Sequence, residues 1–309
     1  MKNIIENQYL CRLYVTTLII MKRFLLILIS ILIILPMAFA GQKRALLVGV
    51  SKYKMHWAPI HGSEDVALLA PELKKQGFKV TTLTNERATH DGIINALNTL
   101  IKQSKKGDIV YIHFSTHGQP VEDYSADEKN DKWDEAIVPY DAGSHYSEAY
   151  KGDKHIIDDV INKYVSEIRT KLGPKGALYV VMDACHAGGS SRVVGTIRGI
   201  DDRGSNEGLS RSNKKFVIDN AEDKRSYQLS NSPRLAPTVF FEACTAKERN
   251  NEILVRGKEY GSLSYMVYLT LMNSKIGTNP STFENAVTRT KANSKLWPKS
   301  QHMVIEKSY

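Results

Sequence analysis

The sequence predicts an α/β fold, a three-layer α/β/α sandwich built around a mostly parallel sheet. Several short apolar runs are rich in β-branched and aromatic residues, as is typical of strands buried on both faces of a parallel sheet. They lie at 44–50, 78–83, 108–114, 177–182 and 238–243. Segments with helical periodicity separate most of these runs, and this alternation favours a sheet covered by helices on both sides.

The first half of the chain shows this alternation most clearly. The strand at 44–50 precedes a helix that we expect to begin with Ser63 as its N-cap, to run to Lys75 and to stop at Gly77. The next strand leads into a second helix that opens near Thr89. Each strand is thus followed by a helix that returns the chain to the same end of the sheet.

Two polar stretches interrupt the pattern in the second half. The first, 119–155, contains one short strand-like piece at 135–139, and the second, about 190–236, is too long for an ordinary loop in a compact domain. The expected elements around them are helices at 156–171, about 261–272 and about 281–293, and a terminal strand at about 302–306.

The first 40 residues have the features of an export signal. Met21-Lys22-Arg23 is a basic start, 24–35 is apolar, and Pro36 to Ala40 ends in an Ala-x-Ala cleavage pattern. The apolar part is shorter than the roughly 20 residues that a membrane span needs. We therefore expect cleavage, no stable membrane span afterwards, and a periplasmic, cell-surface or secreted protein. An uncleaved N-terminal anchor is the alternative.

This interpretation divides the 309-residue chain into an N-terminal extension with signal (1–40, signal 21–40) and one domain, 41–309. The whole chain carries a formal charge of +9, with basic residues concentrated between Arg192 and Arg234. No nucleic-acid-binding motif accompanies them, so we predict no nucleic-acid partner. The sequence does not indicate which oligomeric state the protein adopts.

Cysteine usage points to a reactive thiol. Cys11 lies before the expected cleavage site, which leaves Cys185 and Cys244 in the mature domain. Two cysteines make no disulfide framework, and a thiol retained in an oxidising compartment indicates reactivity. Cys244 lies at the end of an apolar run and fits a small buried hydrophobe better than a nucleophile.

Two short motifs close neighbouring strands and carry the candidate chemistry. Ser115-Thr116-His117-Gly118 follows the run at 108–114, and Asp183-Ala184-Cys185-His186 follows the run at 177–182. Open α/β sheets bind ligands at the carboxyl ends of their strands. A thiolate nucleophile needs an imidazole beside it, so we predict a His117–Cys185 dyad. The backbone amides of Gly118 and Cys185 are the candidate oxyanion hole. This chemistry requires no cofactor. His113, inside its strand, is interpreted as a hydrogen-bonded core residue.

These motifs resemble those of the caspase-like cysteine peptidases of family C14, particularly the bacterial metacaspases (orthocaspases). Asp134 to Asp141 resembles the family's Asp-Glu-x-Ile-x-Pro-x-Asp segment, and Glu252 followed by Gly261-Ser262-Leu263-Ser264 resembles its small-subunit motif. Pro298 to Gln301 is a weaker echo of a stretch near the family's C-terminus. The resemblance extends over 44–309 and implies a caspase-like fold and a polypeptide substrate.

Some positions depart from the family pattern. Asp183 replaces the Gln of the caspase signature, and Thr116 stands where many metacaspases have Gly. The interval between the His and the Cys is also longer, with the extra length in 119–155. None of these changes removes a catalytic group.

By resemblance, Asp183 and Asp65 are the acids of the S1 pocket, with Ser115 on its wall. A carboxylate there attracts Arg or Lys and repels acidic side chains, so the resemblance implies cleavage after Arg or Lys. The alternative for Asp65 is a first-turn helix acid that complements the helix dipole. The alternative for Asp183 is a carboxylate that accepts backbone amides in its turn.

The stretch 190–236 lies where the caspase-like family joins its large and small subunits. This position suggests that the protein cuts itself there, after one of several basic residues: Arg192, Arg198, Arg203, Arg211, Lys214, Lys215, Lys224 and Arg225. An inert loop is the alternative. Many metacaspases need calcium, and the candidate ligands here are Asp127, Glu128, Asp131 and Asp134. No EF-hand spacing is present, so a solvated acidic loop is the simpler interpretation.

The sequence thus predicts an exported cysteine endopeptidase that cleaves after Arg or Lys and processes itself. One alternative is a clostripain- or legumain-like peptidase of the same superfamily. The other is a non-catalytic caspase-like scaffold that binds peptides.

Overall fold

The computed structural model describes residues 12, 14–26, 41–123, 133–184, 198, 208–211, 229–245 and 248–309. The chain divides into two compact units, Met1–Ala40 and Gly41–Tyr309. Residues 14–26 of the first unit are helical. Among the described residues, no helix combines the length and the apolar character needed to cross a bilayer.

A six-stranded sheet forms the centre of the second unit, in the order β11-β8-β7-β3-β1-β2. Neighbouring strands run parallel except for β11, which is antiparallel to β8. The bounds are β1 (Lys43–Gly49), β2 (Phe78–Thr84), β3 (Ile109–Ser115), β7 (Ala177–Asp183), β8 (Thr238–Glu242) and β11 (Val304–Ser308). The mostly parallel α/β sheet predicted from the apolar runs is confirmed.

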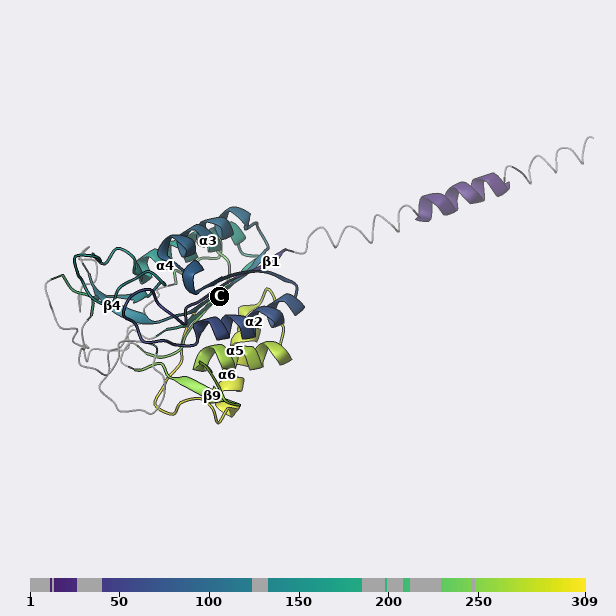
Figure 1. The fold of residues 1–309 in the computed structure, drawn as a ribbon. Helices are drawn as coiled ribbons and strands as arrows, with labels where there is room; N and C mark the ends of the chain where they lie inside the picture. The colour runs from purple at the N-terminus through teal and green to yellow at the C-terminus, as the bar shows by residue number, and fades with distance from the viewer. Residues whose placement is uncertain are drawn as a thin grey trace, which may run out of the picture. The chain divides into compact units, whose positions relative to one another are not determined.

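Helices cover both faces of this sheet (Figure 1). On one side lie α3 (His90–Gln103) and α4 (Asp158–Leu172), and on the other lie α2 (Gly62–Lys75), α5 (Ser262–Asn273) and α6 (Pro280–Asn293). Within β1, Leu46 and Val48 pack toward α3 and α4, while Ala45 and Leu47 pack toward α2. Because both faces are buried, the strands are continuously apolar instead of alternating.

Two smaller sheets lie apart from the central sheet, one mostly within the polar stretch 119–155 and the other at 252–261. The first is antiparallel and consists of β4 (Gly118–Glu122), β5 (Trp133–Ile137) and β6 (Ile156–Ile157), and the second is a hairpin of β9 (Glu252–Val255) and β10 (Lys258–Gly261). The sequence predicted only one short strand in the first region. Strand β4 was missed because it contains Gln119 and Glu122, although all five of its residues are buried.

Helix boundaries show which local signals were correct. Thr89 is the N-cap of α3, and its Oγ1 accepts a hydrogen bond from the Gly92 N–H at 3.1 Å, as expected. Gly77 follows α2 with φ +85°, which suits a glycine stop. The prediction of Ser63 as the N-cap of α2 is wrong. The cap is His61, and the Ser63 N–H donates instead to Ser51 Oγ at 2.9 Å.

Candidate active site

The ends of β3 and β7 bring the two predicted motifs together. Ser115 pairs with Asp183 in the register of the two strands, and His117 follows β3 by two residues. Cys185 lies outside the described residues, as does His186, so the His117–Cys185 dyad stays a prediction. The same holds for the oxyanion hole, of which the structure describes only Gly118, the first residue of β4.

His117 is held as a neutral base in an aromatic cage. Its Nε2 lies 2.8 Å from the carbonyl oxygen of Ala58, which only accepts, so Nε2 carries the proton and Nδ1 the lone pair. The rings of Tyr53 and Trp57 lie against the imidazole, with centroids 5.1 and 5.0 Å away. Its backbone N–H donates to Tyr53 Oη at 2.7 Å. Within the described part of the chain, Nδ1 is buried with no hydrogen-bond partner.

Burial sets the protonation state of this histidine. The pKa of His117 falls to about 4, chiefly because burial disfavours the charged ring. The hydrogen bond to Ala58 raises this pKa and the positive charge of Arg198 lowers it further. The imidazole is therefore neutral at pH 7, with Nδ1 available to accept a proton.

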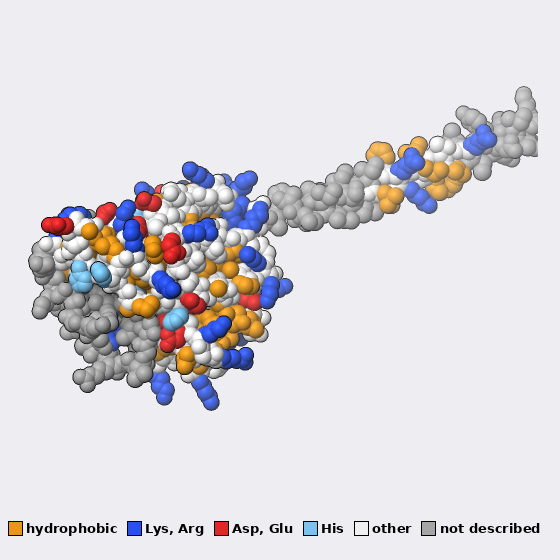
Figure 2. Space-filling model, in the orientation of Figure 1, with side chains coloured by type: hydrophobic (Ala, Val, Ile, Leu, Met, Phe, Trp, Pro, Cys, Tyr) orange, Lys and Arg blue, Asp and Glu red, His pale blue; other side chains and the backbone are white. Residues whose placement is uncertain are grey.

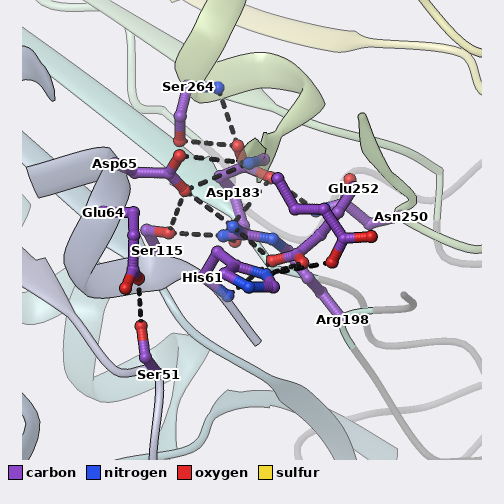
Figure 3. A network of polar contacts seen from close by, with 12 residues as sticks. Ser51, His61, Glu64, Asp65, Ser115, Asp183, Arg198, Asn250, Glu252 and Ser264 are labelled. Carbon is purple, nitrogen blue, oxygen red and sulfur yellow. Dashed lines mark hydrogen bonds and ion pairs between the residues drawn. The ribbon is translucent and has the colours of Figure 1, made fainter. Parts of the chain in front are cut away.

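Beside this histidine site, the guanidinium of Arg198 is buried in a cluster of carboxylates (Figure 3). Its Nη2 lies 2.6 Å from Asp65 Oδ2 and 2.8 Å from Glu252 Oε1. Its Nη1 donates to Ser115 Oγ and, at 3.3 Å, to the carbonyl oxygen of Asp183. The side chains of Arg198, Asp65, Asp183 and Glu252 are all 0% exposed. We call Asp65, Asp183 and Glu252 the carboxylate cluster.

The three carboxylates have different roles. The carboxylate of Asp183 lies 4.0 Å from the guanidinium and instead accepts hydrogen bonds from Asn250 Nδ2 at 2.6 Å and from the Ser264 N–H at 2.7 Å. The alternative interpretation of Asp183 therefore described part of its role, although the amide comes from α5 and not from its own turn. Asp65 lies in the first turn of α2, as its alternative stated, yet it contacts Arg198 directly.

Gly261 allows the cluster to close around the arginine. Its N–H donates to Asp65 Oδ1 at 3.1 Å. A Cβ at this position would clash with Asp183 Oδ2 and would lie 2.8 Å from Arg198 Cζ. The backbone can come this close only without a side chain, which gives a physical reason for the glycine at the start of the Gly261–Ser264 motif.

Three carboxylates surround the single positive charge of Arg198, so the carboxylate cluster and Arg198 together have more negative than positive charge. Burial raises the pKa of Asp65 to about 6, and the charges of Asp183 and Glu252 add to this, against the opposing effect of Arg198. For Asp183, burial also favours the neutral form, but Arg198 and the hydrogen bonds from Asn250 and Ser264 outweigh it and lower the pKa. The surrounding carboxylates raise the pKa of Arg198 despite its burial. On the outer face shown in Figure 2, by contrast with this buried cluster, Lys and Arg side chains are scattered among Asp and Glu.

Sequence reasoning found part of this site. It named Asp65, Asp183 and Ser115 together, and the structure brings all three to the guanidinium. It quoted Glu252 only as part of a motif, and it missed Asn250 altogether. Both residues follow β8 in a polar segment whose local pattern does not distinguish a buried side chain from a solvated one.

Other expectations concern residues next to the site. His113 is buried and hydrogen-bonded to Tyr111 Oη and Ser264 Oγ, both at 2.9 Å, which confirms a core role. Cys244 is 5% exposed, as expected of a buried hydrophobe. Asp134 lies buried on β5 and not on a solvated loop. The other candidate calcium ligands, Asp127, Glu128 and Asp131, lie outside the described residues, so calcium binding stays a prediction.

Comparison with protein families places this site in context. Residues 43–193 match the family model described as metacaspase, peptidase C14 domain. Metacaspase III c of Phaeodactylum tricornutum is 27% identical over 164 residues, which cover 50% of this chain and 45% of the relative. Metacaspase-1A of Neurospora crassa is 29% identical over 160 residues, covering 48% and 32%. The chain thus spans less than half the length of these curated relatives.

Solved structures show the same fold. A protein from Geobacter sulfurreducens superposes with a TM-score of 0.60 at 20% identity, over 87% of this chain and 94% of the other. Caspase-1 from Spodoptera frugiperda gives a TM-score of 0.50 at 13% identity, over 87% of each chain. At these identities the likeness concerns the fold alone. It confirms the caspase-like arrangement that the sequence motifs implied.

Proposed function

We propose that the chain, whose residues 43–193 match the model of the metacaspases, a family of cysteine peptidases, is an endopeptidase that cleaves after basic residues, Arg in preference to Lys. The observation that carries the proposal is the burial of the Arg198 guanidinium between Asp65 and Glu252. A buried cation is stable only where opposite charges and hydrogen bonds replace water. The cluster provides both for a guanidinium.

The shape of the cluster favours Arg over Lys. Nη1 and Nη2 of Arg198 donate in different directions, to Ser115 on one side and to Asp65 and Glu252 on the other. A planar guanidinium presents donors in this fork, whereas a Lys ammonium concentrates its donors on one nitrogen. An acidic side chain would meet the negative charge of the cluster and be repelled.

In the proposed reaction, His117 Nδ1 accepts the proton of the Cys185 thiol, and the thiolate attacks the carbonyl carbon of the basic residue itself. The imidazolium then gives this proton to the leaving amine, and water hydrolyses the thioester. The neutral His117, with its Nε2 proton held by Ala58, supports this assignment because it leaves Nδ1 as the basic atom. The amides of Gly118 and Cys185 are proposed to bind the oxyanion.

We further propose that the chain cuts itself between Arg198 and Gly199. Of the basic residues considered above, Arg198 occupies the carboxylate cluster, and its backbone N–H is held by the Asn250 carbonyl oxygen at 3.0 Å. Arg211 lies elsewhere, with its guanidinium 5.9 Å from the ring centre of Tyr146. The other candidates lie outside the described residues. This position of the Arg198 side chain in the carboxylate cluster supports the proposal that Arg198 lies on the amino side of the scissile bond.

Reporter peptides with Arg, Lys or Asp before the scissile bond test the specificity. We expect hydrolysis to decrease in that order and to vanish in Cys185→Ala. Preferential cleavage after Asp would overturn the assignment of the cluster. An Arg chloromethylketone should label Cys185 in the wild type, whereas an unlabelled thiol together with no hydrolysis would favour the peptide-binding scaffold.

Intact-mass analysis tests self-processing. The wild type should yield fragments that end at Arg198, and Arg198→Ala should lose this cut, whereas Arg211→Ala retains it as the matched control. A Cys185→Ala protein that is still cut in isolation would rule out self-processing.

Export by the signal at 21–40 belongs to the same proposal. Its support is the succession of basic start, apolar run and Ala-x-Ala pattern. Mass analysis of protein recovered from outside the cytoplasm should give a mature chain that begins at Gly41. A chain recovered there with residues 21–40 intact would contradict cleavage.

A further inference from the structure

His61, Glu252 and Glu259 form a group of potential metal ligands, and Glu252 also belongs to the carboxylate cluster. Nδ1 of His61 lies 2.6 Å from Glu252 Oε2 and 3.3 Å from Glu259 Oε2. These three atoms all lie within 4.8 Å of one another. His61 is the N-cap of α2, Glu252 begins β9, and Glu259 lies in β10, so regular elements position all three side chains. Figure 3 shows His61 beside Glu252 at the edge of the network.

The donor set is that of a borderline transition metal. One imidazole nitrogen and two carboxylate oxygens suit Zn²⁺, whereas Ca²⁺ and Mg²⁺ prefer oxygen ligands alone. Zinc holds such ligands at about 2.0–2.2 Å in a tetrahedral arrangement, so ligand atoms lie about 3.2–3.6 Å apart. The His61–Glu259 separation already fits this spacing, and the His61–Glu252 pair needs to open by less than about 1 Å.

The three side chains are also accessible enough for a metal ion to enter and rigid enough to hold it. The His61 and Glu259 side chains are 36% and 34% exposed, which leaves a path for an ion and space for a water ligand. The Glu252 side chain is 0% exposed. Its Oε1 accepts a hydrogen bond from the His61 backbone N–H at 2.7 Å, which fixes the orientation of the carboxylate. Neighbouring groups that orient a ligand in this way strengthen metal binding.

We propose that His61, Glu252 and Glu259 bind Zn²⁺ and that this ion opposes the binding of a basic side chain in the carboxylate cluster. The second part rests on the function proposed above. Glu252 couples the two sites because Oε1 contacts the Arg198 guanidinium at 2.8 Å while Oε2 faces His61. A metal ion on Oε2 draws charge from the carboxylate that holds the guanidinium, and the two cations repel each other. The coupling must act equally in both directions.

Zinc binding is measured on the full chain carrying Cys185→Ala, which prevents self-cleavage and removes the candidate catalytic thiol. Calorimetric titration with Zn²⁺ should give one site, and Co²⁺ should give a visible absorption spectrum of low coordination number. His61→Ala and Glu259→Gln should each weaken Zn²⁺ binding at least about tenfold. The matched control is His302→Ala, because His302 forms a comparable histidine–carboxylate pair with Glu248 at an exposed position. It should leave the affinity unchanged.

The coupling is tested by binding alone, so its result does not depend on peptidase activity. In the same background, Arg198→Ala should tighten Zn²⁺ binding about five- to 150-fold, the usual range of such couplings. Arg198→Lys, which keeps the charge, should change it much less. Circular dichroism confirms that each variant is folded.

Several outcomes overturn the proposal. Failure of Zn²⁺ to bind, equal loss in His302→Ala, or preference for Ca²⁺ over Zn²⁺ would each remove the site. Equal Zn²⁺ affinity with and without the Arg198 guanidinium would remove the coupling. None of these outcomes bears on whether the wild type cleaves after Arg, which the reporter peptides decide separately.

Discussion

Buried arginine–aspartate pairs stand at both ends of the central sheet, and they are built differently. At the amino end, Arg44 at the start of β1 pairs with Asp108 just before β3, and Asp108 also accepts the backbone N–H of Gln42 at 2.7 Å. At the carboxyl end, Arg198 lies among three carboxylates. The first pair is balanced in charge and links the amino ends of the neighbouring strands β1 and β3. The second has an excess of negative charge.

This difference in charge balance assigns a structural role to the amino-end pair and a functional role to the carboxyl-end cluster. A balanced buried pair carries no net charge, and hydrogen bonds such as that from the Gln42 N–H satisfy the rest of its polar groups. An excess of buried carboxylate costs free energy and persists where the site has to hold a cation. The arginine at the carboxyl end also comes from the stretch 190–236, far from its partners in the sequence, whereas Arg44 belongs to the sheet itself. The carboxyl end is therefore where variants should affect activity.

The largest expected effect is the loss of cleavage after Arg in Asp65→Asn. Asn keeps the shape of Asp but removes the charge nearest the guanidinium, and such a loss costs about 2–5 kcal/mol, or about 30- to several thousandfold in kcat/KM. Steady-state kinetics with an Arg reporter measures it. Asp108→Asn is the matched control at the other end of the sheet. Equal losses in the two variants would erase the distinction between the two ends.

The amino-end pair should instead affect stability. Asp108→Asn leaves Arg44 buried with a weakened partner, and breaking a buried pair costs about 3 kcal/mol of unfolding free energy. Urea denaturation of the Cys185→Ala chain, with and without the second change, measures this cost. The kcat/KM of the otherwise wild-type Asp108→Asn enzyme should stay within about twofold. A stable but inactive Asp108→Asn protein would contradict the assigned role.

A third prediction compares how His117 and Asp65 of the carboxylate cluster change the free energy of unfolding with pH. Burial lowers the pKa of His117 to about 4 from 6.5, so unfolding takes up a proton between these values and stability is lost as the pH falls through this window. The loss between pH 7 and pH 5 is about 2 kcal/mol. Burial raises the pKa of Asp65 to about 6, which has the opposite sign, because the folded state then holds the extra proton.

Replacement of each group isolates its contribution. In the Cys185→Ala background, His117→Phe keeps the ring between Tyr53 and Trp57 and should reduce the acid-side loss of stability by about 2 kcal/mol. The rest of the loss persists, because burial also lowers the pKa of His113 to about 4 and that of His155 to about 3. Asp65→Asn should make that loss steeper. Urea midpoints at pH 5, 6 and 7 measure both. A pH profile unchanged by His117→Phe would mean that the imidazole is not buried in its neutral form.

The same contrast shows what the sequence alone could predict. The parallel strands were found because burial on both faces leaves continuous apolar runs. Asp65, Asp183 and Ser115 were grouped correctly by resemblance, and β3 and β7 bring two of them into register. Glu252 was not recognised as a site residue, because a buried carboxylate in a polar segment has the same local sequence as an exposed one.

Two further limits have physical causes. Arg198 was one basic residue among several, and only the three-dimensional arrangement of carboxylates distinguishes it. The strand β4 was hidden because its polar residues are satisfied by partners distant in sequence, such as His155 Nε2, which lies 2.8 Å from Gln119 Oε1. Periodicity reports which side chains are apolar, and it does not report which polar ones find partners.

The smallest predicted effect concerns the cage around His117. Tyr53 Oη accepts the His117 backbone N–H at 2.7 Å, and its ring lies against the imidazole. Tyr53→Phe keeps the ring and removes the acceptor, which should cost about 1 kcal/mol and lower kcat about fivefold. KM for an Arg reporter should not change, because the carboxylate cluster is untouched. Tyr146→Phe is the matched control, since Tyr146 packs against the same hydrophobic cluster as Tyr53, but its ring faces the Arg211 guanidinium and is not one of the two rings against His117. A rise in KM with constant kcat would mean that Tyr53 acts on the cluster and not on the base.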